Sequence, residues 1–377
     1  MGGPSQLLIA NQIATWFPGE KEERLAWIMA VGGLVSMIAT PLAGAISDRT
    51  GSRFGRRAPW ILAGGVVAAL ALIAMGFAGG YALLMGGWVV FQLAIAFSIN
   101  AAKSVAPDQV PRRQFGTVSG VMGLTYTLAL VVGTLIATVL ESTVAYLVTA
   151  AVLVLLIVQF LLGFRDPQVR RDATGPSGAS RLGRILPSPR EHPDFAWVFF
   201  TRLLVTLGNT IALFYLLYFL RDRVQVEDPD TGVLILTVVY ALAVFVTAVI
   251  SGRWSDRVDR RRAFVAWASI GVAAAAIVMA FTVEWWVVVA AAVVLGASWG
   301  VYMAVDQALI NEVLPTVANR GRDMGIMNLA VALPNALAPV IAAIALRNLG
   351  GYPGLYLLAA GLAILGGVLV YRVRSVR

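Results

Sequence analysis

Cysteine is absent from the chain of 377 residues, and histidine occurs only once, at His192. The absence of cysteine excludes disulfide scaffolds, thiolate metal sites and cysteine nucleophiles. A single histidine in a polar stretch gives no basis for a histidine-rich metal site or for a serine–histidine pair within an apolar segment. We therefore expect no bound metal ion and no cofactor.

Charge is also scarce, because charged residues make up 13% of the chain and hydrophobic residues 59%. Soluble domains contain about 25% charged residues, so this chain has roughly half of the usual supply. A soluble fold of this length could not cover its surface with so few charges. The composition therefore predicts an integral membrane protein, with the lipid bilayer as its first partner.

The gaps between charged residues predict the number of membrane-spanning helices, since a helix needs about 20 apolar residues to cross the hydrocarbon. The longest gap, 58–102, is interrupted by Gly79 and Gly80 and is expected to hold two helices. A further apolar segment, 195–220, contains one charge, at Arg202. Together they predict an all-α membrane fold with eleven complete spans. The uncharged gaps are 25–47, 58–102, 114–140, 142–164, 231–252, 263–283, 285–305, 324–346 and 348–371.

A twelfth apolar stretch, 5–17, is too short to cross a bilayer and is followed by Pro18 and Gly19. It lacks the basic segment that is typical of a signal peptide. We interpret it as the second half of a truncated first helix. The alternative is a short helix that lies at the membrane interface.

The basic residues are distributed very unevenly between the two sides of this predicted bundle. One set of alternate loops, together with the C-terminal tail, holds 23 of the 29 lysine and arginine residues, whereas the opposite set holds five. Basic loops remain in the cytoplasm, so we expect a multi-pass protein of the cell membrane whose linker and C-terminus are cytoplasmic. This bias accounts for the net charge of +9 without nucleic acid. The basic set comprises 48–57, 103–113, 165–193, 253–262, 311–323 and 372–377.

The longest of these cytoplasmic segments, 165–193, is rich in glycine, proline, serine and arginine. Such a composition is typical of a flexible linker. It predicts an N-terminal helix bundle over 1–164 and a C-terminal bundle over 194–377.

The two halves resemble each other. Asp48 and Asp256 lie 208 positions apart in similar basic loops, and Pro111 and Pro315 lie 204 positions apart in similar apolar contexts. Two similarities at nearly the same offset indicate parallel six-helix repeats.

The loop after the second helix has a distinctive sequence, GAISDRTGSRFGRR over 44–57, followed by Pro59 and Trp60. This run resembles the signature loop of the major facilitator superfamily. Its extended form is similar to that of sucrose–proton symporters and related glycoside–pentoside–hexuronide transporters. The runs VDQALINEVLP (305–315) and GIMNLAVALPNALAP (325–339) are similar to helices ten and eleven of that branch.

This resemblance implies a major-facilitator fold of two pseudo-symmetric six-helix bundles, in which helices one, four, seven and ten line a central path. It implies a secondary transporter that works by alternating access. The branch implies uptake of a sugar or glycoside coupled to protons, so that a small molecule and protons are the expected ligands. We expect the protein to be monomeric.

The same loop provides candidates for a cytoplasmic gate. Asp48 lies where helix two leaves the membrane, a costly place for an unpaired carboxylate that nearby arginines or a helix N-terminus can stabilise. Glycines there permit close helix approach and a tight turn. By resemblance the cluster ties the two halves together, although the arginines could be topology determinants only. The gate candidates are Gly44, Asp48, Arg49, Gly51, Arg53, Gly55, Arg56, Arg57, Asp108, Asp256 and Arg257.

Three ionisable residues lie within the predicted spans or close to their ends. Arg202 follows Asp194 by eight residues, which places it roughly 12 Å deep, and Asp306 lies roughly 8 Å from the cytoplasmic end of its helix. Lys103 closes helix four at a comparable height. Opposite charges at similar depth are expected to pair. Proton uptake by Asp306 would then release Arg202 or Lys103 as a coupling step; the alternative is a permanent structural ion pair.

Amide and aromatic side chains on the expected path-lining helices are candidates for substrate contacts. Trp299, Tyr302 and Asp306, for example, share one face of their helix. Sugars are commonly held by such a mixture, but each residue could instead serve helix packing or the lipid interface. The candidates are Asn11, Gln12, Gln92, Asn100, Asn209, Tyr215, Trp299, Tyr302, Gln307, Asn328 and Asn335.

Other transport modes fit less well. The span 25–47 has no acidic residue, unlike the second helix of sodium-coupled glycoside transporters, which argues against sodium coupling by that route. Neither lysine follows a glycine, so the chain has no ATP-binding phosphate loop. The segment 125–137 lacks the glycine–proline signature of drug antiporters. Efflux of amphipathic drug-like compounds is nevertheless the competing transport function.

An enzyme from another class is a remote alternative. The run GASWG over 296–300 matches G-x-S-x-G, with Ser298 as the nucleophile of a membrane-embedded hydrolase. That motif works at a turn between a strand and a helix, whereas this run lies within an apolar span. Gly296 and Gly300 instead predict a small-residue packing face, and we expect that the protein is not an enzyme.

Overall fold

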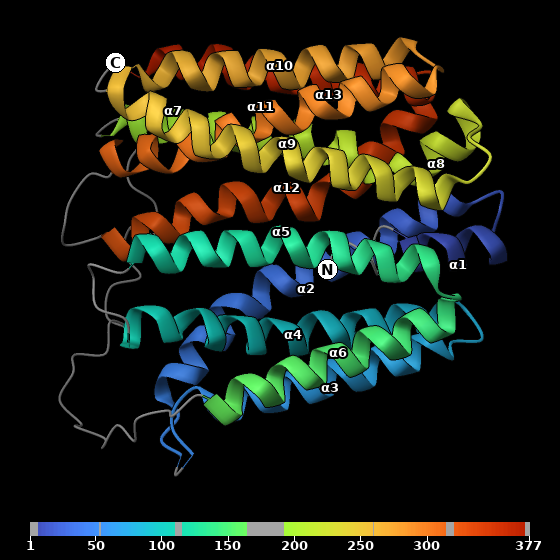
Figure 1. Ribbon diagram of the computed structural model, residues 1–377, viewed down its shortest axis with the longest axis vertical. Helices are drawn as coiled ribbons and strands as arrows, with labels where there is room; N and C mark the ends of the chain where they lie inside the picture. The colour runs from blue at the N-terminus through green and yellow to red at the C-terminus, as the bar shows by residue number, and fades with distance from the viewer. Residues whose placement is uncertain are drawn as a thin grey trace. The chain divides into compact units, whose positions relative to one another are not determined.

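The computed structural model describes residues 7–52, 54–109, 115–163, 192–258, 260–313 and 320–373. This part of the chain is helical apart from its turns and one isolated β-bridge, which confirms the all-α prediction (Figure 1). The elements are α1 (Ile9–Trp16), α2 (Lys21–Arg49), α3 (Ala58–Gly76), α4 (Tyr81–Gln109), α5 (Phe115–Val139), α6 (Ser142–Gly163), α7 (Pro193–Phe214), α8 (Leu216–Phe219), η3 (Leu220–Val224), α9 (Pro229–Val258), α10 (Arg261–Phe281), α11 (Trp285–Val313), α12 (Arg320–Asn348), α13 (Tyr352–Leu369) and η5 (Val370–Arg372).

Within the described residues, ten helices are long and apolar enough to cross a membrane. The eleventh predicted span corresponds to α5, which has 25 residues and whose segment Leu128–Val139 is apolar. The short stretch at the start of the chain forms α1, a helix of eight residues. Many leucine, isoleucine and valine side chains on the long helices are exposed. Such extensive apolar surface is expected where a helix bundle faces lipid.

Exposed tryptophans mark two levels of the bundle along α10 and α11. Trp267 lies near the first turn of α10, and Trp286 lies in the first turn of α11, after the turn that connects the two helices. The two residues therefore lie toward opposite ends of this helical hairpin. Tryptophan is enriched at both membrane–water interfaces, so the positions fit a hydrocarbon layer between them.

The chain separates into two compact units, Met1–Gly178 and Ala179–Arg377. The division falls within 165–193, the range predicted as a linker, most of which lies outside the described residues. The bundle boundaries and the linker function of this range stay predictions.

The two units share one pattern of helix pairing. In the first unit α3 contacts α4 and α6, and α2 contacts α4. In the second unit α10 contacts α11 and α13, and α9 contacts α11. Each pair of the second unit joins the counterparts of a pair in the first, and in Figure 1 α10 and α13 run side by side as α3 and α6 do. The pairing therefore confirms the repeated architecture predicted from the sequence.

The seam between α2 and α4 depends on a glycine of α2. A Cβ on Gly32 would collide with the indole nitrogen of Trp88. One turn further along α4, Gln92 donates a hydrogen bond from Nε2 to the Gly32 carbonyl oxygen at 3.4 Å. Large side chains of α4 therefore lie over a small residue of α2.

The equivalent seam between α9 and α11 has the small residues on the other helix. A Cβ on Gly296 would lie 2.5 Å from the Tyr240 carbonyl oxygen, and one on Gly300 would collide with Val244. Thr247 completes the seam, donating a hydrogen bond to the carbonyl oxygen of Ala297 at 2.9 Å. Gly296 and Gly300 thus form a small-residue packing face against α9, as the sequence predicted.

The span predicted over 195–220, which is helix seven of the implied fold, is not a continuous helix. It is interrupted at Tyr215, between α7 and α8, and continues as the π-helical turn η3. Gln225 then ends the turn in the left-handed conformation, with φ of 57°. The break leaves the Arg202-bearing segment of α7 as a regular helix of 22 residues.

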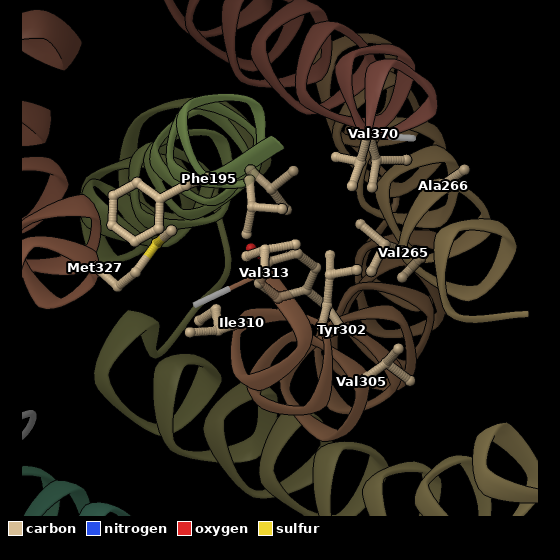
Figure 2. Packing of buried hydrophobic residues seen from close by; sticks show 14 of the residues in the cluster. Phe195, Val265, Ala266, Tyr302, Val305, Ile310, Val313, Met327 and Val370 are labelled. Carbon is tan, nitrogen blue, oxygen red and sulfur yellow. The ribbon is translucent and has the colours of Figure 1, made fainter. Parts of the chain in front are cut away.

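A buried apolar cluster fills the interior of the second unit beside Tyr302 (Figure 2). It joins α7, α10, α11, α12, η5 and Val373, which follows η5. Leu309, Ile310 and Val313 continue α11 from the position of Asp306 into this cluster. Asp306 is therefore followed along α11 by residues that pack in the apolar cluster.

Candidate functional site

The two charges predicted to pair within the second unit do lie next to each other. Nη1 of Arg202, on α7, is 3.4 Å from Oδ2 of Asp306, on α11. Asp306 is only 6% exposed. The contact depends on α7 and α11 being neighbours, a tertiary relation that brings together residues 104 positions apart in the chain.

The Asp306 carboxylate makes a long contact with Arg202 and a shorter hydrogen bond with Tyr302. A charge-assisted hydrogen bond between guanidinium and carboxylate is typically about 2.7–2.9 Å long, and at 3.4 Å the Nη1 atom makes none. Nε and Nη1 of Arg202 are both buried without a hydrogen-bond partner in the described part of the chain. The Tyr302 hydroxyl, in contrast, donates to Oδ1 of Asp306 at 3.0 Å. Asp306 thus has a firm neutral donor on one oxygen and a displaceable cation near the other.

Aromatic and amide groups lie on the same two helices. The rings of Trp299 and Tyr302 stack with centroids 5.2 Å apart and an interplanar angle of 19°. Asn209, on α7, is 5% exposed and donates from Nδ2 to the Tyr240 hydroxyl at 3.4 Å. Its Oδ1 atom is buried and has no hydrogen-bond partner among the described residues. An orphaned buried acceptor is costly, so this site can accept a hydrogen bond from a ligand.

Sequence reasoning missed Tyr240, which reaches Asn209 from α9. Nothing in its local pattern distinguishes it from other aromatic residues of an apolar span. Tyr215, in contrast, was predicted and is buried at the break of helix seven, stacked near Tyr218 at 5.9 Å.

In the first unit, both polar atoms of the Gln12 amide make structural contacts. Its Nε2 atom donates to the Met75 carbonyl oxygen at 3.3 Å, and its Oε1 atom accepts from the Tyr146 hydroxyl at 2.9 Å. These bonds tie α1 to α3 and α6. Each polar atom of the Gln12 amide thus has a protein partner, which favours a structural role over a substrate contact.

The remaining path candidates are distributed over several helices. In α4, Gln92 is buried with its Oε1 atom unpartnered among the described residues, and Asn100 donates to the Ala96 carbonyl oxygen at 2.7 Å. Asn11 is half-buried in α1, and Lys103 is exposed on α4. Asn328 and Asn335 are exposed on α12. The Gln307 side chain lies outside the described residues, and the pairing of Lys103 with Asp306 stays a prediction.

The loop after α2 forms a tight turn that is fastened to the helix. Gly55 has φ of 92° and bridges to Ser52, so it needs the conformational freedom of glycine. The buried Arg57 donates from Nη1 to the Ser47 hydroxyl at 2.9 Å, and Trp60 donates from Nε1 to the Thr50 hydroxyl at 2.7 Å. These bonds fix the predicted gate loop between α2 and α3.

Other gate candidates show less. Gly51, predicted to permit the tight turn, has no positive φ, and no described atom lies within 4 Å of a Cβ placed on Gly44 or Gly51. The part of Gly44 and Gly51 in a gate stays a prediction. Arg56 is half-buried. Arg53 lies outside the described residues, as do the side chains of Asp48, Arg49, Asp108, Asp256 and Arg257.

The run that matches a hydrolase motif has the wrong local structure for one. Residues 296–300 lie within α11, a single helix of 29 residues, and not at a turn between a strand and a helix. Ser298 lies against Gly271 of α10, where a Cβ would collide with its hydroxyl. The motif is therefore part of helix packing.

A comparison with protein-family models agrees with the repeated helical architecture. The model of the family described as Major Facilitator Superfamily matches residues 19–228 and matches again at residues 198–377. Both halves of the chain are therefore covered by the same family model.

Proposed function

The chain belongs to the Major Facilitator Superfamily, and from this premise we propose that it carries a sugar or glycoside into the cell together with protons. Membership makes the protein a multi-pass membrane transporter of small molecules and, at the level of the family, not an enzyme. The substrate class, the coupling ion and the direction of transport are our proposal.

The observation that carries proton coupling is the pair formed by the largely buried Arg202 and the buried Asp306. A carboxylate within a membrane span is retained at considerable cost and is typical of proton relays. Among the described residues of the second unit, the candidate spans contain three acidic residues, Asp194, Asp230 and Asp306. Asp194 and Asp230 lie in the first turns of α7 and α9, whereas Asp306 lies within α11, seven residues before its end. Because its contact with Arg202 is long, protonation can break it without the loss of a short hydrogen bond.

The coupling step follows from charge balance. Asp306 takes a proton from water on the outer side, becomes neutral and no longer holds Arg202 by charge. The freed guanidinium, whose Nε and Nη1 donors lack protein partners among the described residues, can then bind oxygen atoms of the substrate. After the inward change of conformation, release of the proton restores the attraction between Arg202 and Asp306 and displaces the substrate.

The chemistry of the neighbouring side chains supports a polyhydroxylated substrate. The half-buried ring of Trp299 offers an aromatic face, and the buried Oδ1 atom of Asn209 needs a donor such as a hydroxyl group. Such combinations of apolar face and directed polar groups are typical of small-molecule sites. We further propose that the loop after α2, fastened by Arg57, belongs to the cytoplasmic gate predicted from the sequence.

Uptake into proteoliposomes tests this function. An inward proton gradient is imposed, and entry of labelled sucrose, maltose or glucose is measured alongside proton entry with an internal pH-sensitive dye. Asp306→Asn is compared with wild type and with Asp228→Asn, a matched control that changes an exposed carboxylate at the start of α9. We expect sugar-dependent proton entry in the wild type and the control, and its loss in Asp306→Asn.

Two results would contradict the proposal. Sugar uptake that is unchanged in Asp306→Asn would make the pair purely structural. Extrusion of an amphipathic dye, with no response to any sugar, would support the efflux function instead.

A further inference from the structure

The contacts between α7 and α11 form consecutive layers. Arg202 contacts Asp306, and one turn further along α7 Thr206 forms a side-chain hydrogen bond with Tyr302. The residue number rises along α7 and falls along α11, so the two helices are antiparallel. By the same register, the next layer places Asn209 level with Trp299.

Tyr302 occupies the middle layer and contacts both of its neighbours. It is 2% exposed. Its hydroxyl donates to Asp306, and its oxygen accepts the hydrogen bond from Thr206, since its own proton is already engaged. Its ring stacks on Trp299. Tyr302, predicted from the sequence to line the substrate path, therefore uses both its ring and its hydroxyl group in contacts with other protein side chains.

The Tyr302 side chain therefore connects two sites, because it contacts both the Asp306 carboxylate and the Trp299 ring. A ligand that stacks on Trp299 can move the Trp299 ring, and the Tyr302 ring, stacked with its centroid 5.2 Å away, then follows it or loses the contact. Rotation of the Tyr302 ring lengthens its hydrogen bond to Asp306. Loss of that bond changes how readily the carboxylate binds a proton, because a donor to the ionised form favours that form.

We propose that Tyr302 is the positioning residue that transmits occupancy of the Trp299 layer to the protonation of Asp306. The inference rests on the proposed coupling function of the pair. Among the described residues, Arg202 from α7 and Tyr302 from α11 are the groups that act on Asp306 by charge or hydrogen bond. Tyr302 is the one of the two that also contacts the aromatic layer.

The first experiment removes single hydroxyl groups. Tyr302→Phe keeps the ring and deletes only the hydroxyl, whereas Thr206→Val deletes the hydroxyl that supports it. Tyr356→Phe is the matched control, since Tyr356 is a fully buried tyrosine of the same unit whose hydroxyl has no partner among the described residues. Melting temperatures of the purified variants establish that each is folded.

Two readouts separate positioning from a structural role. The first is net proton-driven sugar uptake compared with exchange of sugar across the same membrane, which needs no net proton release. The second is the infrared carboxyl band of Asp306, identified by its absence in Asp306→Asn and titrated without any sugar.

For Tyr302→Phe we expect net uptake to slow about tenfold, because loss of the hydrogen bond to the Asp306 carboxylate hinders proton release. Exchange and its KM should stay at the wild-type level, since exchange needs no net proton release. The proton concentration that half-protonates Asp306 is expected to fall about tenfold. Thr206→Val should give a smaller change in the same sense, and Tyr356→Phe none. Trp299→Leu should alter the titration in the wild type but not in the Tyr302→Phe background.

The inference is overturned if the infrared titration of Tyr302→Phe coincides with that of the wild type, or if Trp299→Leu acts equally in both backgrounds. A wild type that moves no sugar defeats the proposed sugar symport instead, because the titration and the double-mutant comparison need no sugar and still decide the role of Tyr302.

Discussion

At the scale of single residues, the site consists of a few polar groups in an apolar interior. Arg202 and Asp306 could be found from the sequence because a charge within an apolar span is conspicuous. Tyr302 was found by its spacing from Asp306, but its role depends on Thr206 and Trp299, which only the packing of α7 against α11 reveals. Tyr240 could not be found, since it reaches Asn209 across a helix seam.

The first prediction concerns the balance of charge in this interior. Arg202→Met leaves the Asp306 carboxylate buried without its cation, and removal of one partner of a buried pair typically costs about 3–5 kcal/mol in the free energy of unfolding. The double variant Arg202→Met, Asp306→Leu should recover most of this loss, because no charge remains unpaired. Thermal unfolding in detergent at neutral pH measures both. Equal stability of the single variant and the wild type would show that the carboxylate is not isolated from water.

At the scale of elements, the helices and their order follow from apolar length and charge spacing, and the sequence predicted them well. The break at Tyr215 was not predicted, because the segment 195–220 has neither proline nor an unusual charge near that point. The π-helical turn η3 and the left-handed Gln225 belong to the same region. Such local departures depend on the surrounding aromatic packing, which sequence periodicity does not record.

A second prediction tests the seam between α9 and α11. Gly296→Ala places a Cβ 2.5 Å from the Tyr240 carbonyl oxygen, and a backbone atom cannot move aside as a side-chain end can. Overpacking of this kind typically costs about 1–3 kcal/mol, so the melting temperature should fall. Gly361→Ala is the control, because no described atom lies within 4 Å of its added Cβ. Equal melting temperatures of the two variants would show that α9 and α11 can move apart at this seam without loss of stability.

A third prediction concerns the first turn of α9. The Asp228 carboxylate accepts hydrogen bonds from the Thr231 hydroxyl at 2.6 Å and the Thr231 amide at 3.2 Å. These bonds hold the pKa of Asp228 below its ordinary value. Since the pKa is lower in the folded state, the stabilisation is present above the unfolded pKa and is lost as pH falls through the folded pKa.

Asp228→Ala should therefore lower stability by about 1 kcal/mol or less at neutral pH, as for other exposed N-caps. The difference from the wild type should narrow between about pH 5 and about pH 2. Melting curves of both proteins across this range provide the measurement. A difference that is constant with pH would mean that the carboxylate charge is not involved.

At the scale of the whole molecule, two units repeat one pairing pattern, and each has its own buried contacts. The offsets of 208 and 204 positions predicted this repetition from two short similarities. The contacts of the predicted cytoplasmic gate could not be derived from these offsets. Its predicted members come from several loops, and the structure shows a hydrogen bond from Arg57 to Ser47 and a positive φ at Gly55, while their role in gating stays a prediction.

The fourth prediction follows from the division between Gly178 and Ala179. The segment 179–377, expressed alone in detergent, should unfold cooperatively, because the apolar cluster around Tyr302 lies entirely within it. The segment 283–377 is the control, since it separates α11 from α10 and removes α7. Aggregation of both segments would contradict the independence of the second unit.

The different placement of small residues in the two equivalent seams also shows how far the two halves differ. Gly32 corresponds to Tyr240 and Gln92 to Gly296 at the two offsets of the repeat. The first unit has its glycine on α2, whereas the second has it on α11, and Tyr240, at the position that corresponds to Gly32, accepts a hydrogen bond from Asn209. The halves have therefore ceased to be interchangeable. A chain assembled from two copies of the first half would therefore lack both the Asn209–Tyr240 contact and the pair of Arg202 and Asp306.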